Sequence, residues 1–467
     1  MTFSMGAGRA VRTAAASLGA ALLVLVAGCD RKYAIADPPP AGTPTLDAQL
    51  RQTLAGWGVM PILPMPAQSP ALVDLGQALF FDKILSGNRD VSCASCHDPL
   101  MHATDGRSLA IGTGAVGAGT TRVLGEGRNF TPRSAPSIIN TGLRSFYLFW
   151  DGRVNVEGGP ARFQTPAGPA LPLGLVNLLA AQAMFPVVNR NEMRGDVGDV
   201  DRFGNPNELA RFGDAEFGVI WSATMQRLLA VNEYIAKFNA AYPGVPRTAL
   251  GFQHAANAIA AFETQAFTHT NSPFDRYLAR DDRALTDVQK HGALLFFGKA
   301  RCSSCHFGAT LGGQSFANAG VPQLGPGTGK GAPLDLGRGD VVDQEFYKFS
   351  FRVPSLRNVE LTAPYAHNGA FPTLDAVVRH YNNVEKSLRT YDVSQLDPAL
   401  RASYHGDAAT INAVLASLDG RLRTPINLTD DEIEQLVAFL KSLTDPSARD
   451  LSGVVPARVP SGLPVRE

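Results

Sequence analysis

Four of the five cysteines in this chain lie in two CxxCH motifs, Cys93 to His97 (CASCH) and Cys302 to His306 (CSSCH). Two thiols three positions apart can add to the two vinyl groups of one porphyrin, and the adjacent histidine can bind its iron. The motifs therefore predict two covalently bound c-type haems, with zinc knuckles or redox disulfides as the alternative. The predicted haem-binding residues are Cys93, Cys96, His97, Cys302, Cys305 and His306.

The segments that must position these motifs are similar to each other. Leu75 to Phe81 (LGQALFF) precedes the first motif, and His291 to Phe297 (HGALLFF) precedes the second. Thr286 and Gln289 form a capping box for the second helix, and Thr429 begins an amphipathic helix near the C-terminus. This repetition indicates the internal duplication of a small haem domain.

Composition and length favour a loop-rich, globular protein. The 467 residues are enough for two or three domains, 46 are Gly and 32 are Pro, and no series of alternating strands is present. Lys plus Arg and Asp plus Glu both number 42, which excludes a bulk field that attracts nucleic acid or an anionic membrane. The predicted fold is mostly α, with two cytochrome-c-like haem domains packed against each other.

The N-terminus predicts export. Basic residues precede an apolar run from Ala14 to Gly28, which is too short to span a bilayer and ends at Cys29. This pattern is typical of a bacterial lipoprotein signal at 1–28, in which Cys29 is lipidated, with an ordinary cleaved signal as the alternative. Residues 29–50 then read as a tether, and we expect a periplasmic protein held at the inner membrane by its lipid anchor alone.

The ligand opposite His306 cannot be a methionine from the same domain, because all eight methionines lie at or before Met225. The remaining candidates are His367, His380, His405, a Lys or a Tyr. Thr373 can cap a helix that places Tyr381 on its apolar side and turns His380 about 100° away. Spacing alone favours Tyr381 as a core aromatic.

Three further segments carry a family resemblance. They are FWDGR (Phe149 to Arg153), a set formed by Gln182, Pro186 and Glu192, and RVPSLRNVELTAPYAHNG (Arg352 to Gly369). Together with the two haem motifs, they resemble the bacterial dihaem cytochrome c peroxidases, including the MauG-like branch. The resemblance covers about residues 70 to 445.

This resemblance implies unequal roles for the two haems. In the family the N-terminal haem reacts with peroxide and the C-terminal haem takes in electrons, which implies domains at 51–275 and 280–447 and a tail at 448–467. Trp150 is then the expected electron bridge. Glu192 is the expected distal acid, because Gln182 and Pro186 precede it at the family's intervals, and such a carboxylate can move a proton between the two oxygens of peroxide.

The sequence departs from the family pattern beside both haems. Where many members carry a distal histidine, Ile111 to Gly114 offers Thr113, a poor iron ligand. We therefore expect the N-terminal haem to be open in the oxidised protein, with His102 packed in the loop after CASCH. At the C-terminal haem the resemblance aligns Tyr381 as the distal ligand, which is the MauG-like choice.

The family also implies a calcium ion between the domains. Thr362 and Pro364 match the carbonyl ligands, but Arg133 to Pro136 (RSAP) lacks the usual asparagine, so Asn129 is the substitute side-chain ligand. The expected function is reduction of hydrogen peroxide with electrons from a small cytochrome c or cupredoxin. The alternatives are MauG-like oxidation of a partner protein through high-valent dihaem states, and a dihaem electron carrier without catalysis.

Overall fold

The structure is a computed structural model that describes residues 44–466 apart from 118, 144–145 and 157–162. Cys29, the predicted signal at 1–28 and the tether as far as residue 43 lie outside the described residues. From Pro44 onward the chain forms one compact unit. Among the described residues, no helix has the length and apolar character needed to cross a membrane.

The predicted mostly-α fold is confirmed. Short helices are joined by long loops, and the strands of the described residues form two antiparallel ladders, β1 (Tyr147–Leu148) with β2 (Val154–Asn155) and β3 (Phe316–Ala317) with β4 (Phe351–Arg352). The helices are α1 (Leu46–Gly56), α2 (Pro70–Phe81), α3 (Cys93–Cys96), α4 (Leu178–Ala183), α5 (Phe217–Leu228), α6 (Asn232–Ala241), α7 (Phe252–Ala266), α8 (Pro273–Leu278), α9 (Asp287–Phe297), α10 (Arg338–Val342), α11 (Leu374–Asn382), α12 (Val384–Arg389), α13 (Ala408–Ala416) and α14 (Asp430–Lys441).

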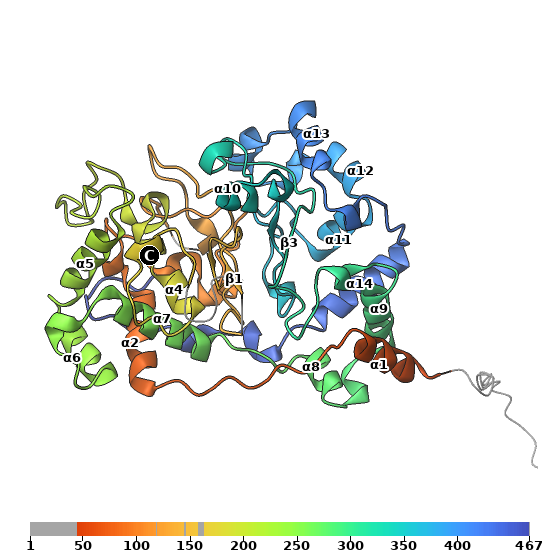
Figure 1. Cartoon of the computed structure of the whole chain (residues 1–467), viewed down its shortest axis with the longest axis horizontal. Helices are drawn as coiled ribbons and strands as arrows, with labels where there is room; N and C mark the ends of the chain where they lie inside the picture. The colour runs from red at the N-terminus through yellow and green to blue at the C-terminus, as the bar shows by residue number, and fades with distance from the viewer. Residues whose placement is uncertain (1–43, 118, 144–145, 157–162, 467) are drawn as a thin grey trace, which may run out of the picture. The chain divides into compact units, whose positions relative to one another are not determined.

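The N-terminal haem domain is built on the crossing of α2 and α7 (Figure 1). Its core contains Leu79, Phe80 and Phe262, all nearly inaccessible to solvent. The two helices approach closely at Gly76, where an added Cβ would lie 1.9 Å from the carbonyl oxygen of Ala258. A side chain cannot occupy that space, so glycine sets the distance between the helices.

The C-terminal haem domain repeats this crossing with α9 and α14. An added Cβ at Gly292 would lie 1.9 Å from the carbonyl oxygen of Gln435 and 2.9 Å from the Cβ of Phe439. The predicted capping box begins α9, because Thr286 Oγ1 accepts from the Gln289 amide at 3.3 Å and Gln289 Oε1 accepts from the Thr286 amide at 2.9 Å. The matching glycine contacts support the predicted duplication.

The N-terminal helix α1 belongs to the C-terminal haem domain. Leu50 and Leu54 are buried in the same core as α9 and α14. Trp57 Nε1 donates to the carbonyl oxygen of Phe297 at 3.0 Å, and Figure 1 shows α1 beside α9. The sequence had predicted this helix as part of the tether and the N-terminal haem domain, so the boundary at residue 51 is wrong. The apolar face of α1 packs against helices that are distant in the sequence, and the spacing of apolar residues within α1 does not indicate which helices those are.

The C-terminal tail, in turn, packs on the N-terminal haem domain. Ser461 Oγ donates to Asp82 at 2.6 Å, and Arg466 Nη2 donates to Asp98 at 2.8 Å. Its apolar residues join the core of α2 and α7, and they are Ala448, Leu451, Val459 and Leu463. The tail is therefore a structural part of the N-terminal haem domain, which the sequence had ended at residue 275.

Candidate haem sites

The first CxxCH motif is held in a tight turn. Ser92 begins α3 with a reciprocal cap, in which its amide donates to Ser95 Oγ at 2.9 Å. His97 follows the turn, and its Nδ1 lies 3.4 Å from the carbonyl oxygen of Ala103. Burial lowers the pKa of His97 to about 4, so the imidazole is neutral. A neutral ring held through Nδ1 leaves Nε2 available to an iron.

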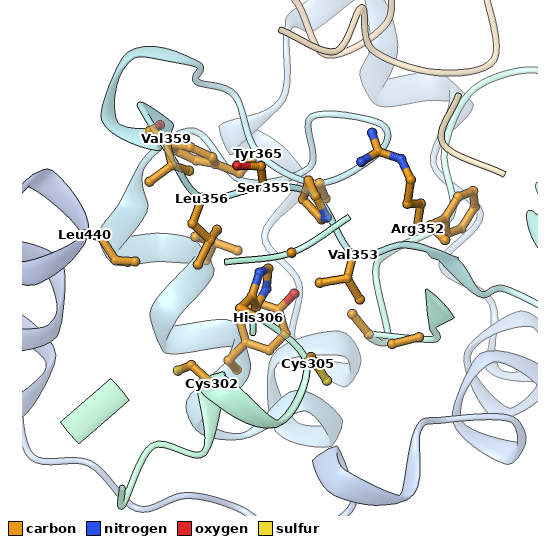
Figure 2. Close-up of a pocket in the computed structure, with 18 of the residues that line it drawn as sticks. Cys302, Cys305, His306, Arg352, Val353, Ser355, Leu356, Val359, Tyr365 and Leu440 are labelled. Atoms are coloured by element: carbon orange, nitrogen blue, oxygen red, sulfur yellow. The ribbon is translucent and has the colours of Figure 1, made fainter. Parts of the chain in front are cut away.

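The second motif repeats this arrangement. His306 Nδ1 lies 3.1 Å from the carbonyl oxygen of Leu311, and burial lowers its pKa to about 4. Cys302, Cys305 and His306 line a mainly apolar cavity, and Figure 2 shows His306 between the cysteine segment and the segment that begins at Arg352.

Both motifs fit a c-type haem better than the alternatives. Each supplies two free thiols and one histidine whose Nδ1 is held by the backbone. Among the described residues, no cluster of three or more His, Cys, Asp or Glu side chains could hold a metal ion by itself.

The cavity of the second motif contains Tyr381. Thr373 caps α11 by accepting from the Ala376 amide at 3.1 Å, and the helix brings Tyr381 to the cavity wall. No described residue hydrogen-bonds its hydroxyl. Burial raises the pKa of Tyr381, and Cys305 and Cys302 raise it further, so the hydroxyl lies close to both thiols. A phenol in this position can act as an axial ligand if the metal displaces its proton.

The histidines of this region are less suited to that role. His380 uses both ring nitrogens, with Nε2 2.8 Å from the Ala319 carbonyl oxygen and Nδ1 3.0 Å from Ser387 Oγ. His405 Nε2 lies 3.1 Å from the carbonyl oxygen of another loop. His367 lines the cavity but stacks on Phe351 with ring centroids 3.5 Å apart.

Arg352 is a site residue that the sequence analysis missed. It lines the same cavity, and its Nε donates to the carbonyl oxygen of Phe149 at 3.2 Å. Burial lowers the pKa of Arg352 to about 10, although Asp151 raises it. A buried guanidinium facing a haem cavity suits a haem carboxylate. Its position at the start of the RVPSLRN segment was the available signal.

The WDGR segment lines the cavity of the second haem motif and acts electrostatically on Glu192. Trp150 lines the cavity of the second motif, its carbonyl oxygen accepts from the Arg352 amide at 2.7 Å, and its Nε1 donates to Ser134 at 3.0 Å. Three residues later, Arg153 lies close enough to Glu192 to lower the pKa of that carboxyl. The segment therefore extends from one haem region to the other.

A buried ion-pair triad fixes this segment between the domains. Arg133 Nη1 donates to Asp151 at 2.5 Å, and Arg133 Nε donates to Asp335 at 2.6 Å. All three side chains are less than a tenth exposed. Separating these side chains would leave an uncompensated buried charge. The triad therefore stabilises the contact between the segments that carry Arg133, Asp151 and Asp335.

Glu192 lies in a π-helical turn, Arg190–Arg194, beside the first haem motif. Asn189 caps this turn by accepting from the Glu192 amide at 3.1 Å. The Glu192 carboxyl is close enough to Cys96 to affect the pKa of its thiol. Burial raises the pKa of Glu192, while Arg153 and Arg133 lower it and Asp151 raises it. No described residue hydrogen-bonds this carboxyl, so it is free to contact a ligand.

The loop at Thr113 lies directly against Glu192. Its amide donates to the Glu192 carbonyl oxygen at 3.0 Å, and an added Cβ at Gly112 would lie 2.0 Å from the Asn191 carbonyl oxygen. The Thr113 hydroxyl donates to both Asp90 oxygens at 3.0 Å. Thr113 is thus occupied as a structural residue.

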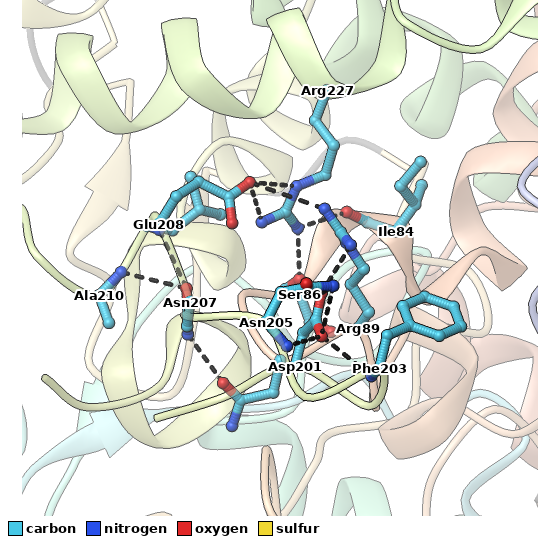
Figure 3. Close-up of polar contacts among 12 residues, drawn as sticks. Ile84, Ser86, Arg89, Asp201, Phe203, Asn205, Asn207, Glu208, Ala210 and Arg227 are labelled. Atoms are coloured by element: carbon cyan, nitrogen blue, oxygen red, sulfur yellow. Dashed lines mark hydrogen bonds and ion pairs between the residues drawn. The ribbon is translucent and has the colours of Figure 1, made fainter. Parts of the chain in front are cut away.

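Figure 3 shows a polar network around Arg227, Glu208 and Asn207. Arg227 Nη1 donates to the carbonyl oxygen of Ser86 at 2.6 Å, and Arg227 Nη2 donates to Glu208 at 2.5 Å. Asn207 Nδ2 donates to the Arg194 carbonyl oxygen at 2.7 Å. These bonds tie the chain before Cys93 to the chain after Glu192.

Three other residues were predicted near the first haem, and they are Gln182, Pro186 and His102. Gln182 is half-buried on α4, and Pro186 begins a short turn that leads to Asn189. The ring of His102 contacts the C-terminal tail, with Nδ1 3.2 Å from the Ala448 carbonyl oxygen, so its packing within the loop after CASCH stays a prediction. No hydrogen bond joins Gln182 to Glu192 among the described residues, so their common role stays a prediction.

The predicted calcium ligands are only partly brought together. Thr362 and Pro364 line the cavity of the second motif, whereas Asn129 is exposed on a loop. The Ser134 hydroxyl is hydrogen-bonded to the His367 carbonyl oxygen at 3.1 Å. Nothing in this geometry supports Asn129 as a calcium ligand.

Comparison with known proteins identifies relatives that share this arrangement. A family model described as di-haem cytochrome c peroxidase matches residues 70–283. Cytochrome c551 peroxidase of Pseudomonas aeruginosa is 30% identical over 325 residues, which are 69% of this chain and 75% of that protein. The methylamine utilization protein MauG of Methylorubrum extorquens is 29% identical over 362 residues, which are 76% of this chain and 82% of that protein.

Other relatives extend the comparison. Cytochrome c peroxidase Ccp of Escherichia coli is 33% identical over 326 residues, 68% of this chain, and the match spans 55% of that longer protein. The crystal structure of a MauG-like protein associated with microbial copper homeostasis has a TM-score of 0.56 and 26% identity, covering 84% of this chain and 96% of that one. The chain therefore belongs to the dihaem cytochrome c peroxidase family, whose members include MauG, and is an oxidoreductase with two c-type haems.

Proposed function

We propose that this protein reduces hydrogen peroxide at the haem held by Cys93, Cys96 and His97. The observation that carries the proposal is the position of Glu192, whose carboxyl lies beside that motif without a hydrogen-bond partner among the described residues. The haem supplies the iron that binds peroxide and the electrons that reduce it. Glu192 supplies the proton transfer that this reduction needs.

Glu192 acts as a general base and then as a general acid. Its carboxylate takes the proton of the bound oxygen and returns it to the departing oxygen, which leaves as water. Burial raises the pKa of Glu192, which brings it closer to neutral pH and makes the return of the proton easier. The Thr113 loop and the Asn189 cap hold the backbone of Glu192, so the carboxyl meets the ligand in a fixed position. Gln182 and Pro186 are proposed to shape the same pocket.

Electrons are proposed to enter at the second haem, held by Cys302, Cys305 and His306, with Tyr381 as its distal ligand. The donor is a small cytochrome c or cupredoxin. Trp150 provides the path to the first haem, because it lines the cavity of the second haem motif. Arg153, three residues later in the same segment, lowers the pKa of Glu192 beside the first motif. The Arg133 triad keeps that path intact.

Steady-state turnover tests this function. Purified holoprotein is mixed with peroxide and a reduced small cytochrome c, and oxidation of the donor is followed. We expect turnover that saturates with peroxide and falls sharply in Glu192→Gln. Donor oxidation that is independent of peroxide, or equal in both proteins, would instead identify an electron carrier.

The second candidate function is peroxide-dependent oxidation of a partner protein. The cavity position of Tyr381 and the similarity to MauG favour it, because a phenolate ligand lowers the potential of an iron and favours its oxidised forms. This candidate predicts that peroxide alone changes the spectra of both haems, with slow decay when no reduced donor is present. If the change is limited to the first haem, the peroxidase is the better account.

Two further features remain proposals about location and structure. The protein is proposed to be exported to the periplasm and lipidated at Cys29, and loss of membrane retention in Cys29→Ser would support this. A calcium ion is proposed near the carbonyl groups of Thr362 and Pro364. Metal analysis of the holoprotein before and after chelation, with domain stability as a second readout, tests it.

A further inference from the structure

The N-terminal haem domain buries several carboxyls that the mechanism above does not use, and one of them, Glu263, leaves a buried oxygen without a partner among the described residues. Glu263 lies on α7 and is only 6% exposed. Its Oε2 atom is buried and has no hydrogen-bond partner among the described residues. A carboxyl in this state costs free energy, so its retention in the core calls for an explanation.

The internal duplication shows which way Glu263 faces. The two close approaches pair Phe262 with Phe439, because these residues meet Gly76 and Gly292 in the same way. The next residue of each helix is then Glu263 in the first domain and Leu440 in the second. Leu440 lines the cavity of the second haem motif (Figure 2). Glu263 therefore occupies the position that faces a haem.

An independent observation agrees with this placement. Glu263 is close enough to Cys93 to raise the pKa of that thiol, and Cys93 is one of the two attachment points of the first haem. Ile259, one turn earlier on α7, corresponds to Leu436, which also lines the second cavity. At these two cavity-facing positions, the first domain has Ile259 and Glu263 where the second has Leu436 and Leu440, so one apolar residue is replaced by a carboxyl.

Among the residues that the structure describes, no cation forms an ion pair with this carboxyl. On α2, Asp74 pairs with Lys237 at the surface, and α4 carries no titratable residue. On α5, Arg227 is bound to Glu208 and to backbone carbonyl groups. The only shift in the pKa of Glu263 comes from burial, which raises it to about 8. A change of charge at the neighbouring haem would consequently act on Glu263 without competition from a fixed ion.

We propose that Glu263 binds one proton when the N-terminal haem iron gains an electron, and releases it when the iron is oxidised. The electron comes from the reduced donor and the proton comes from solvent. The proton bonds to a carboxylate oxygen of Glu263, and no other bond forms or breaks. The positive charge of the oxidised site favours the carboxylate, and the added electron removes that charge.

The midpoint potential of the first haem should therefore fall as pH rises. For a one-electron step linked to one proton, a tenfold change in proton concentration is equivalent to 59 mV at the limit. The proposal rests on a haem at Cys93, Cys96 and His97, which the proposed function also requires, but it does not depend on the reaction with peroxide.

Spectroelectrochemical titration of the holoprotein between about pH 5 and pH 9 tests the proposal. We expect a pH-dependent potential for the first haem in the native protein, and loss of that dependence in Glu263→Gln and in Glu263→Leu, which copies Leu440. Glu192→Gln is the matched control, because it removes one of the two other carboxyls near this haem, Asp105 being the second, and it should keep the dependence. The second haem should respond to pH in the same way in all four proteins.

Infrared difference spectra provide a second readout. Reduction of the first haem should produce the C=O stretch of a protonated carboxylic acid, and Glu263→Gln should lack it. A potential whose pH dependence survives in Glu263→Gln but disappears in Glu192→Gln would overturn the proposal. Loss of peroxide turnover with the pH-dependent potential retained would overturn only the proposed function.

Discussion

The two haem sites share one scaffold and differ in the side chains that face the haem. Each has a glycine-mediated helix crossing, a CxxCH turn and a histidine whose Nδ1 is held by the backbone. The first site adds carboxyls, which are Asp105, Glu192 and Glu263, whereas the second has Tyr381 and Leu440 in its cavity. The repeated elements account for haem attachment, and the differing residues account for the proposed division of labour.

The two domains also differ in how they are completed. The second receives α1 from the N-terminal side of the chain, and the first receives the C-terminal tail. Each terminal segment passes the nearer domain and packs on the farther one. This exchange, together with the Arg133 triad, makes the relative position of the haems a property of the whole chain.

The largest expected effect separates the two attachment sites. Cys93→Ala/Cys96→Ala and Cys302→Ala/Cys305→Ala should each lower covalent haem content from two to one, because thioether bonds require these thiols. Only the first variant should also lose the spectral response to peroxide. Haem content by absorbance and a peroxide titration check this. Equal peroxide responses would refute the assignment of unequal roles.

The next effect concerns Glu192. Glu192→Gln should lower kcat/KM for peroxide by roughly 10²- to 10⁴-fold, the usual range for loss of a general acid–base group. The exposed Glu126→Gln is the control and should be silent.

The pH profile of the native enzyme should follow the same residue. Since burial raises the pKa of Glu192 and the base form is needed first, activity should decline on the acid side at a higher pH than an ordinary glutamate would give. A profile that is the same in Glu192→Gln and the native protein would contradict the role.

Stability should respond equally at the two helix crossings. Gly76→Ala and Gly292→Ala each force a Cβ to within 1.9 Å of a carbonyl oxygen, so each should destabilise the protein by about 1–3 kcal/mol or more. Gly218→Ala on α5 has no atom within 4 Å of the added Cβ and should be neutral or slightly stabilising. Denaturant unfolding measures the difference, and a large effect at only one crossing would break the structural equivalence.

The smallest effect concerns the tail. Arg466→Gln removes a half-exposed ion pair with Asp98 and should lower stability by about 0.2–1 kcal/mol. Arg458→Gln, which removes a pair at the outer surface, should leave the thermal midpoint unchanged. If both variants behave alike, the Arg466 contact contributes nothing to the closure of the first domain.

Local patterns were sufficient to predict the haem motifs and the helices beside them. The capping boxes at Thr286 and Thr429 depend on residues three positions apart, and both are present. Helical geometry also predicted that His380 lies about 100° from Tyr381. His380 still lines the cavity of the second motif, but both of its ring nitrogens are hydrogen-bonded to other residues.

Local sequence patterns did not predict the packing between segments that are distant in the sequence. The sequence predicted a tether through residue 50, but the partners of Leu50 and Leu54 lie more than two hundred residues away. Arg352 and Glu263 were missed for the same reason, because their significance comes from a cavity formed by distant segments. Among the described residues, the absence of a cation beside Glu263 depends on which distant segments pack against it, so the sequence could not indicate it.

The central claim, that the two haems are unequal and that the first is open to peroxide, is tested most directly by rapid mixing of the fully oxidised holoprotein with peroxide. The account predicts an immediate spectral change at the first haem without prior reduction, slowed in Glu192→Gln and unaffected in rate by Tyr381→Phe. A native protein that responds to peroxide only after one haem has been reduced would contradict it.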